Sequence, residues 1–398
     1  MAITVINPRI RGFICTTSHP EGCAANVRRQ VAVAKAAARP AARPYTVLVI
    51  GSSAGYGLAS LITAVFGHGA RALSVCFERE GKGDKPGSAG WYNLAEVHRL
   101  ARAEGRTVET INGDAFGHAV KAQALDALQA RFGAVDLVVY SLASPKRKDP
   151  QSDTVWSSTL KPIGEAYASK TLDTDTDQVK DIAIGAASEA EIAATAKVMG
   201  GEDWAMWISS LLGRGLLAPG ARTVAYSYIG PALTHAIYRA GTIGRAKDHL
   251  ERTGRELSAT LKAAVGGAAW VSVNKALVTQ ASAAIPVVPL YISLLYRVMR
   301  EQGCHEGTIE QMVRLWRDHL APGATPATDG EGRIRLDDWE MRPAVQSAVA
   351  ALWPTLTSAN LPAISDYAVF KREFRQLFGF EVDGIDYAVP VEVERSLG

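Results

Sequence analysis

The chain has few cysteines and almost no net charge. Four cysteines in 398 residues stand at positions 15, 23, 76 and 304, and none belongs to a CxxC pair. Cys15 and Cys23, with His19 between them, are too widely spaced for a zinc motif, so we expect no metal site and the reduced thiols of a cytosolic protein. The formal charge of +3 is too small and too dispersed for a nucleic-acid-binding protein, which usually carries a basic stripe.

The sequence also lacks a signal peptide, an internal repeat and a clear membrane segment. Its first residues, MAITVINPRIRGF, contain no basic segment followed by an apolar run. One uncharged stretch, 276–296, is long enough to span a bilayer. It contains Gln280 and prolines at 286 and 289, so we interpret it as a buried strand end, a loop and a helix. We therefore expect a cytoplasmic protein without stable membrane insertion.

What the chain does contain is an alternation of short apolar runs and helical patterns. The runs are rich in β-branched residues and lack polar alternation, as expected of parallel strands buried on both faces. The expected strands are 45–51, 72–78, 107–114, 135–143, 222–230 and one near 271–279. Strands that alternate with helices indicate an α/β fold with a Rossmann-like doubly wound parallel sheet.

The pattern changes after residue 143. A polar, basic segment is followed by a capping box at Ser188 and Glu191 and by a tryptophan-bearing helix, which predicts an extra helical substrate lobe. Residues 377–394 alternate like a C-terminal hairpin. We expect one enlarged Rossmann-like domain over 1–398. Its parts are a cofactor-binding core (45–143 and 222–300), the substrate-lobe insert (144–221) and a C-terminal extension (301–398).

A glycine-rich turn directly follows the first core strand. The segment GSSAGYGLAS contributes Gly51, Gly55 and Gly57 and opens the next helix. Such a turn lets backbone amides approach a pyrophosphate at the positive end of the helix. A plain tight turn is the alternative, but the strand–turn–helix context favours dinucleotide binding. The residues that line the same turn are Ser52, Ser53, Ala54 and Tyr56.

Further candidate cofactor contacts stand where the next strands end. Phe77 and Glu78 end the second strand, and the Glu78 carboxylate would bond the adenosine ribose hydroxyls and repel a 2′-phosphate, which favours NADH over NADPH. An ion pair with Arg79 or a solvated strand end is the alternative for Glu78. Ligands collect at the carboxyl ends of such strands. The corresponding candidates on the third and fourth strands are Asp114, Ala115, Leu142 and Ala143.

Tyr238 and Lys247 are candidates for a catalytic pair. They are nine residues apart, so one unbroken helix would place them on opposite faces. Gly241, Thr242 and Gly244 lie between them and predict a chain break and a helix start, which removes that objection. A phenol stabilises the negative charge that builds on oxygen when a carbonyl or a conjugated double bond is reduced. A nearby ammonium lowers the pKa of that phenol and can bond the nicotinamide ribose.

The residues alone leave a second interpretation of this pair open. In it, Tyr238 is a core aromatic and Lys247 is a solvated helix residue. Tyr228, at the end of a strand, could make a second contact to substrate. His235, three residues before Tyr238, is either a packing residue or a proton relay.

Several long segments resemble one family. They are NPRIRGFICTTSHPEGC, GSSAGYGLA, YSYIGP, the Tyr-x8-Lys pair at 238 and 247, NKALVTQASAAIP and FGFEVDGIDY, which follow in this order over nearly the full length. On these motifs the chain resembles the long, monomeric trans-2-enoyl-CoA/enoyl-acyl-carrier-protein reductases of the FabV type. That family is an enlarged branch of the short-chain dehydrogenase/reductase fold.

The resemblance implies a monomer that uses NADH to reduce enoyl-CoA or enoyl-acyl carrier protein in fatty acid biosynthesis. Hydride would go to the β carbon, and the resulting enolate would be protonated at the α carbon. The resemblance implies that Tyr238 is the catalytic donor, that Lys247 is its partner and a cofactor ligand, and that Tyr228 contacts substrate. The further cofactor contacts that it implies are Leu277, Val278 and Thr279.

Two other functions fit the same fold. A ketone reductase would use the same tyrosine–lysine chemistry, and a redox sensor would bind NADH without turnover. The basic run Lys146, Arg147 and Lys148 follows the fourth strand. It is either a docking point for a phosphopantetheine substrate at the mouth of the site or a solvated loop.

Overall fold

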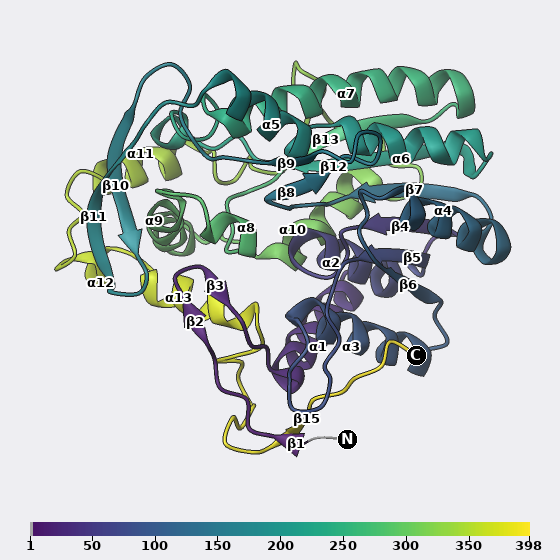
Figure 1. Cartoon of the computed structure of the whole chain (residues 1–398), viewed down its shortest axis with the longest axis horizontal. Coiled ribbons are helices and arrows are strands. Elements are labelled where there is room, and N and C mark those ends of the chain that lie inside the picture. Colours follow the sequence, from purple (N-terminus) through teal and green to yellow (C-terminus); the bar gives the residue numbers. More distant parts are fainter. Residues whose placement is uncertain (1–2) are drawn as a thin grey trace.

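Seven parallel strands form the centre of the molecule. In the computed structural model, which describes residues 3–398, each neighbouring pair of strands in this sheet is parallel. The strand order is β14 (Ile334–Arg335), β13 (Ala268–Val273), β12 (Leu217–Ser227), β7 (Val135–Tyr140), β4 (Thr46–Ile50), β5 (Arg71–Cys76) and β6 (Val108–Asn112). The direction of winding reverses between β4 and β7, so the predicted Rossmann-like doubly wound sheet is confirmed (Figure 1).

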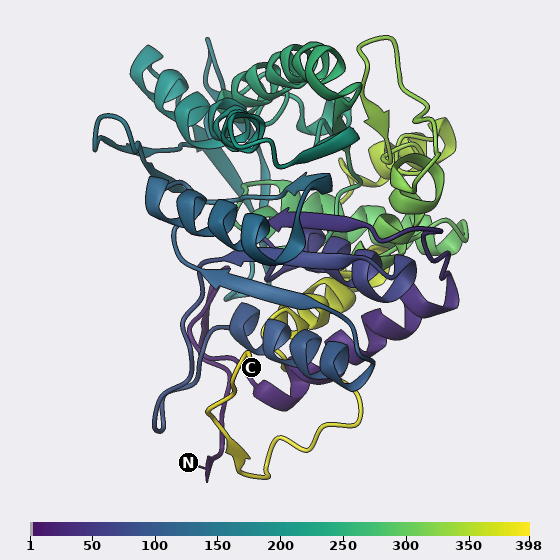
Figure 2. The same ribbon diagram turned by 90° about the vertical axis from the view of Figure 1, so that its right-hand side faces the viewer.

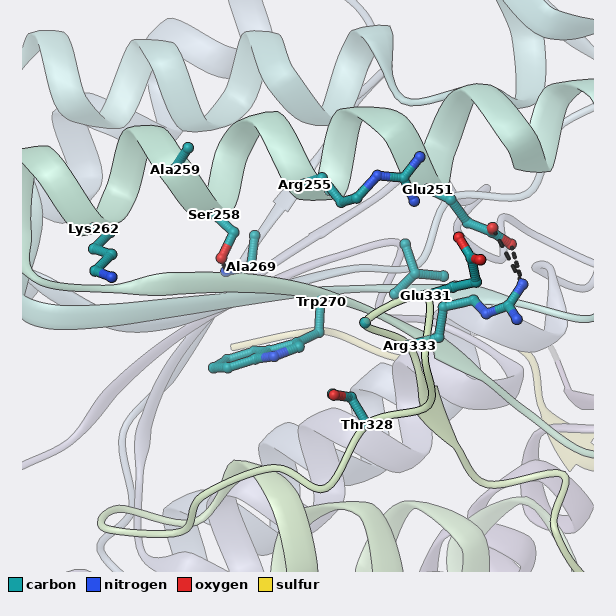
Figure 3. Close-up of a pocket in the computed structure, with 13 residues that line it drawn as sticks. Glu251, Arg255, Ser258, Ala259, Lys262, Ala269, Trp270, Thr328, Glu331 and Arg333 are labelled. Carbon is teal, nitrogen blue, oxygen red and sulfur yellow. Dashed lines mark hydrogen bonds and ion pairs between the residues drawn. The ribbon is translucent and has the colours of Figure 1, made fainter.

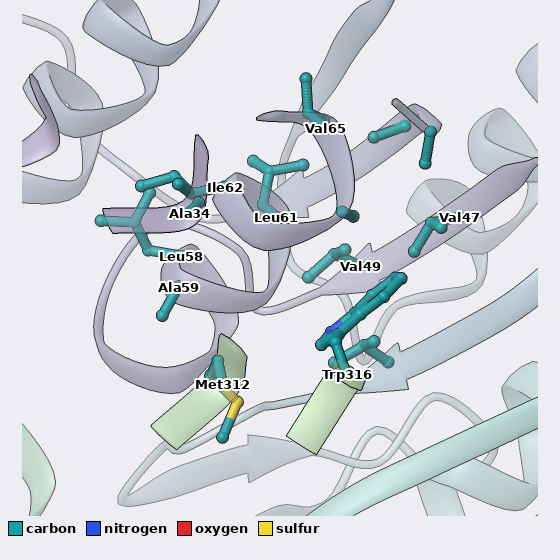
Figure 4. Close-up of a cluster of buried hydrophobic side chains, with 14 of the residues drawn as sticks. Ala34, Val47, Val49, Leu58, Ala59, Leu61, Ile62, Val65, Met312 and Trp316 are labelled. Atoms are coloured by element: carbon teal, nitrogen blue, oxygen red, sulfur yellow. The ribbon is translucent and has the colours of Figure 1, made fainter. Parts of the chain in front are cut away.

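Helices cover both faces of this sheet (Figure 2). Val47 and Val49 of β4 belong to one apolar cluster, and Leu48 and Ile50 belong to another, because successive side chains of a strand point to opposite faces. The first cluster includes α1 (Pro20–Ala36), α2 (Gly55–Ile62), α3 (Ala89–Ala103) and α10 (Thr308–Leu315). The second includes α4 (His118–Ala127), α6 (Glu202–Gly213) and α7 (Thr242–Val265). Figure 4 shows Trp316, from the C-terminal quarter, beside the β4 and α2 side chains of the first cluster.

Short turns of other helix types extend or join several of these helices. Three π-helical turns follow α2, α4 and α10 directly, and a 3₁₀ turn precedes Tyr238. They are η1 (Thr63–Gly67), η2 (Leu128–Phe132), η4 (Trp316–Leu320) and η3 (Ala232–Thr234).

The insert between β7 and β12 contains strands as well as the expected helices. Its two antiparallel hairpins are β8 (Lys146–Lys148) with β9 (Val155–Ser157), and β10 (Tyr167–Asp173) with β11 (Gln178–Ile184). The helices α5 (Glu189–Met199) and α6 follow, and α5 begins with the predicted capping box of Ser188 and Glu191. The insert is therefore a mixed lobe, and β12 begins at Leu217, earlier than the sequence pattern indicated.

A third apolar cluster lies beyond the carboxyl ends of the strands. It is built around α9 (Val288–Glu301), which is surrounded by C-terminal helices and the β10–β11 hairpin (Figure 1). The other helices here are α8 (Gln280–Ala283), α11 (Pro343–Leu352), α12 (Leu361–Ile364) and α13 (Tyr367–Gln376). The uncharged stretch 276–296 forms a loop, α8 and the start of α9, and β13 ends before it. Among residues 3–398, no helix has the length and apolarity needed to cross a membrane.

The predicted hairpin within 377–394 is wrong. β15 (Val391–Glu392) pairs instead with β1 (Ile3–Thr4), and these two strands lie side by side at the bottom of Figure 1. Turns bury Phe378 and Phe380 of this segment in the third cluster, whereas Val389 is 51% exposed. Gly379 has a φ of +79°, and a Cβ there would lie 2.5 Å from the His19 carbonyl oxygen, so this stretch cannot run as a strand. The remaining short pair is β2 (Ile10–Arg11) with β3 (Ile14–Cys15).

Candidate active site and cofactor-binding site

The glycine-rich turn joins the end of β4 to the start of α2. Gly51 has a φ of +83°, and a Cβ there would lie 2.3 Å from the Ser141 carbonyl oxygen. A Cβ on Gly57 would lie 1.8 Å from the Gly51 carbonyl oxygen. Both positions therefore need glycine for the chain to fold back this tightly. α2 starts at Gly55 with Ala54 as its N-cap and no side-chain cap, so its first amides are free for an anionic ligand.

The other residues of this turn hold it in place. The Ser52 side chain is buried and lies 2.5 Å from the Ser74 hydroxyl, so it faces the sheet. The Ser53 hydroxyl donates to the Glu78 carboxylate at 2.5 Å. The Tyr56 hydroxyl donates to the Lys275 carbonyl oxygen at 2.7 Å, which ties the turn to the chain after β13.

The strand-end candidates lie along one edge of the sheet, because their strands are parallel neighbours. The backbone of Glu78 is held by Asn112, whose side chain bonds its amide at 2.7 Å and its carbonyl at 2.8 Å. Arg79 donates to the Pro86 carbonyl rather than to Glu78. Phe77 is 77% exposed, which is unusual for a large apolar side chain at a strand end.

The third and fourth strands bring their candidates to the same edge. Asp114 accepts a hydrogen bond from the Phe116 amide at 3.0 Å. Ala115 is buried, and its carbonyl oxygen accepts from the ammonium of Lys121 at 2.8 Å. Leu142 packs partly against the second apolar cluster, and Ala143 is exposed. Ala143 and Phe77 are therefore the most accessible of the predicted adenosine contacts.

Tyr238 and Lys247 lie on either side of a chain break, as predicted. Tyr238 lies within a series of turns that runs from His235 to Ala240, and α7 begins at Thr242. A Cβ on Gly244 would lie 2.8 Å from the Tyr238 carbonyl oxygen, so the first turn of α7 packs directly on Tyr238. Lys247 donates to the Tyr226 carbonyl oxygen of β12 at 3.3 Å. The Tyr238 ring lies edge-on to the Tyr228 ring, with centroids 4.9 Å apart.

The electrostatics of the pair follow from burial. Tyr238 is 6% exposed, and burial raises its pKa, so the phenol keeps its proton. In the described part of the chain its hydroxyl has no hydrogen-bond partner. Burial lowers the pKa of Lys247 to about 8, although the nearby Glu251 carboxylate opposes this shift. The Tyr238 phenol is therefore protonated at neutral pH, whereas the Lys247 ammonium begins to lose its proton just above it.

The loop from Leu277 to Thr279 lies over the glycine-rich turn. The Thr279 methyl group is 3.9 Å from the position of a Cβ on Gly55. The Val278 amide donates to the Tyr296 hydroxyl at 3.1 Å. Thr279 caps α8, because its hydroxyl accepts from the Ser282 amide at 3.0 Å. The predicted residues of this loop and of the turn are thus brought together.

Sequence reasoning missed the buried polar residues beneath this site. Glu340 is fully buried and accepts a hydrogen bond from Tyr228 at 2.9 Å. Lys275 is 2% exposed, donates to the Ala276 carbonyl at 3.1 Å and lies over the Tyr296 ring. Burial lowers the pKa of Lys275 to about 8. Lys275 falls in the NKALVTQASAAIP motif, whereas no local pattern marks Glu340.

The structure corrects the hypothesis for the basic run. Arg147 is 1% exposed, pairs with Glu202 at 2.7 Å and also donates to the Lys197 carbonyl oxygen. It is a buried structural cation, which fits neither a docking point nor a solvated loop. Lys146 is exposed, and Lys148 is exposed and paired with Asp153.

His235 is half-buried, and its Nε2 lies 3.0 Å from the Gly230 carbonyl oxygen. This contact connects the imidazole to the loop that follows β12. The arrangement fits the packing interpretation of His235, because the contact on this ring nitrogen is to the backbone.

A pocket of about 350 Å³ lies away from these residues, between α7 and the 328–333 loop (Figure 3). Trp270 and Arg255 are among the residues that line it. Arg333 bonds the buried Glu251 here, at 3.3 Å. Glu251 stands one turn after Lys247 on α7, so this ion pair contributes to the charge environment behind Lys247.

A doubly wound sheet with a glycine-rich turn at its first strand defines a Rossmann-like, dinucleotide-binding class of protein. Three family models match consecutive parts of the chain. Their descriptions are "NAD(P)H binding domain of trans-2-enoyl-CoA reductase" for residues 5–83, "Trans-2-enoyl-CoA reductase catalytic region" for 85–321 and "Enoyl reductase FAD binding domain" for 328–391. The chain belongs to the trans-2-enoyl-CoA reductase family, as the resemblance of its motifs predicted.

Similar proteins and structures extend over the whole chain. Enoyl-acyl-carrier-protein reductase (NADH) of Coxiella burnetii, strain RSA 331, is 51% identical and covers 99% of this chain and 97% of its own. The protein of the same name from Opitutus terrae is 53% identical, with 98% of each covered. The trans-2-enoyl-CoA reductase of Treponema denticola, solved with NAD, has a TM-score of 0.91 at 46% identity, with 98% of each chain covered. The Clostridium acetobutulicum enzyme, solved with NADH, has a TM-score of 0.93 at 38% identity, also with 98% of each covered.

The FAD in the third description does not match the residues of that segment. Residues 328–391 form β14 and the helices α11 to α13. The connection from β14 to α11 contains no glycine, so the segment lacks the glycine-rich strand-to-helix turn that cradles a dinucleotide pyrophosphate. The turn at Gly51–Gly57 fits such a group, because its glycines permit close approach and the first α2 amides are free.

Proposed function

We propose that this protein reduces the trans-2 double bond of an enoyl thioester, carried by CoA or by acyl carrier protein, with NADH as the reductant. The observation that carries the proposal is the arrangement of Tyr238 and Lys247 around the end of β12. Lys247 bonds the carbonyl of Tyr226, and Tyr238 packs on Tyr228, two residues further along the chain. Membership of the trans-2-enoyl-CoA reductase family supports the same reaction class.

The cofactor would be held by residues on both sides of the turn. Gly51, Gly55 and Gly57 admit the pyrophosphate to the N-terminus of α2. Glu78, oriented by Ser53, would accept from the adenosine ribose hydroxyls. The remaining proposed contacts are Ser52, Ala54 and Tyr56 in the turn, Phe77, Asp114, Ala115, Leu142 and Ala143 along the adenosine, and Lys247, Leu277, Val278 and Thr279 at the nicotinamide end.

The chemistry divides between the cofactor and the protein. NADH, when bound, supplies the hydride that adds to the β carbon. Negative charge then builds on the thioester oxygen, where the Tyr238 hydroxyl donates a hydrogen bond to it, and a proton taken up from solvent at the α carbon completes the saturated thioester. Because burial raises the pKa of Tyr238, the phenol remains a donor at neutral and moderately alkaline pH. Lys247 contributes a positive charge behind the phenol and a hydrogen bond to the nicotinamide ribose. Tyr228 forms the facing wall for the substrate.

A direct assay tests this function. The purified protein is mixed with NADH and crotonyl-CoA, and the loss of NADH absorbance is followed with mass-spectrometric detection of butyryl-CoA. We expect turnover with crotonyl-CoA and little with small ketones. A reversed preference would make the protein a ketone reductase. NADH binding without turnover of any enoyl thioester, on CoA or on acyl carrier protein, would make it a sensor.

We also propose that the enzyme works as a cytoplasmic monomer. The proposed catalytic, cofactor-binding and substrate-binding side chains all come from one chain. The four cysteines are free thiols, which fits a reducing compartment. Sedimentation equilibrium at assay concentration tests the oligomeric state, and a stable dimer would contradict it.

A further inference from the structure

Glu340 lies at the centre of a buried hydrogen-bond network beneath the proposed site. It is fully buried in the segment between β14 and α11. One carboxylate oxygen, Oε1, accepts from the Tyr228 hydroxyl at 2.9 Å and from the Tyr291 hydroxyl at 2.6 Å. The other, Oε2, accepts from the Ala276 amide at 2.7 Å. An ionised carboxylate is an acceptor only, so all three donors suit the charged form.

The surroundings of Glu340 favour one orientation of these donors. Gln346 donates to the Tyr291 oxygen at 3.1 Å, which leaves the Tyr291 proton for Glu340. Burial raises the pKa of Glu340, and its hydrogen bonds and the buried positive charge of Lys275 oppose that shift. A buried carboxylate with no hydrogen bonds would be strongly unfavourable. The three hydrogen bonds that Glu340 accepts offset this cost.

The network reaches both halves of the proposed active site. On the substrate side, the Tyr228 hydroxyl donates its proton to Glu340, so the Tyr228 oxygen can only accept a hydrogen bond from groups in the site. Tyr238 is then the tyrosine that donates a hydrogen bond to the substrate oxygen. The two tyrosine rings meet edge-on at an interplanar angle of 80°. On the cofactor side, the Ala276 amide directly precedes Leu277 to Thr279 in the loop that follows β13.

We propose that Glu340 is a positioning residue for the enoyl reduction. Glu340 fixes the Tyr228 hydroxyl beside Tyr238 by accepting its proton, and it anchors the loop before Leu277 through the Ala276 amide. One carboxylate thus sets the geometry of the substrate side and of the cofactor side of the site. This inference rests on the proposed function. Glu340 comes from the C-terminal extension, which gives that extension a role in the site beyond packing.

The first test is the substitution Glu340→Gln, which keeps the shape of the side chain. Its amide group has two N–H donors and one acceptor oxygen, so it cannot accept from the tyrosines and from Ala276 together. We expect kcat with crotonyl-CoA to fall by about tenfold to a hundredfold, the effect of a small misplacement of reacting groups. Asp337→Asn is the matched control. Asp337 is 1% exposed in the same segment and pairs with Arg335 at 2.7 Å, with no contact to the three donors of Glu340.

A double-mutant cycle with Tyr228→Phe separates positioning from a general loss of stability. If Glu340 acts on kcat mainly through Tyr228, Glu340→Gln should lower kcat by less than about threefold in the Tyr228→Phe background, whereas its effect through the Ala276 contact should persist there as a raised KM for NADH. The melting temperature of each variant is measured alongside. Glu340→Asp replaces Glu340→Gln in the cycle if the latter does not fold, because it retains the charge and shortens the side chain by one methylene.

The outcomes distinguish this inference from the proposed function. A wild-type protein that does not reduce any enoyl thioester with NADH overturns the function. If the wild type is active, three results would overturn the positioning role alone. They are a folded Glu340→Gln variant with wild-type kcat, an equal loss of kcat in Asp337→Asn, and additive effects of Glu340→Gln and Tyr228→Phe on kcat.

Discussion

We expect kcat/KM for NADH to fall at alkaline pH because the Lys247 ammonium loses its proton. Its pKa is lowered to about 8 by burial, and the ammonium form supplies three donors, one of which bonds the Tyr226 carbonyl. Between pH 7 and pH 9.5 the protonated fraction falls from about 0.9 to about 0.03, so kcat/KM for NADH should fall about thirtyfold. Tyr238 does not contribute to this fall, because burial raises its pKa.

The assay measures kcat/KM for NADH at saturating crotonyl-CoA and constant ionic strength, since screening changes with salt. Lys247→Arg keeps its charge at all these pH values, so the variant should be less active overall but lose the alkaline fall. Lys262→Met is the control. Lys262 is an exposed residue of the same helix, in the separate pocket of Figure 3, and its variant should retain the wild-type profile.

Two results would refute this reasoning. A wild-type profile that stays flat to pH 10 would show that the charge of Lys247 is not needed to use NADH. An alkaline fall that persists in Lys247→Arg would assign the titration to another group. Lys275 would be the first candidate, because burial lowers its pKa to about 8 as well.

Three further substitutions, one of them with a matched control, test other parts of the site and fold. Tyr238→Phe should lower kcat by about 10² to 10⁴ with unchanged NADH affinity, and near-wild-type kcat would exclude the phenol as oxyanion donor. Wild type should prefer NADH to NADPH by about tenfold to a thousandfold in kcat/KM, and Glu78→Ala should lower that ratio. An unchanged ratio would show that Glu78 does not set the cofactor preference. Arg147→Ala should lower the free energy of unfolding by about 2 to 4 kcal/mol in urea, because it removes a buried guanidinium that bonds the Lys197 carbonyl and one carboxylate oxygen of Glu202, whose other oxygen stays paired with the Lys197 ammonium. Lys148→Ala should leave the free energy of unfolding almost unchanged, because its ion pair with Asp153 is exposed, and equal losses in the two variants would contradict the structural role of Arg147.

Local sequence determined the elements of the core and the turn between them. Buried parallel strands need continuous apolar runs, and this made β4, β5 and β7 predictable to within one to three residues. A side chain at position 51 or 57 would collide with backbone atoms, so the two glycines were enough to predict the tight turn from the sequence. The glycines between Tyr238 and Lys247 likewise predicted the break that lets the two approach the same strand.

Tertiary structure decided which partner each polar or alternating segment would meet. The C-terminal alternation suggested a hairpin, but Val391–Glu392 pairs with the N-terminal strand almost four hundred residues away. Arg147 looked like a surface cation until α6 supplied Glu202. Glu340 carries no local signal, because its three donors come from β12's end, the loop after β13 and α9. The hydrophobic periodicity of a segment indicates its secondary structure and its buried face. The groups that bond a buried charge come from distant segments, so they are known only once the chain has folded.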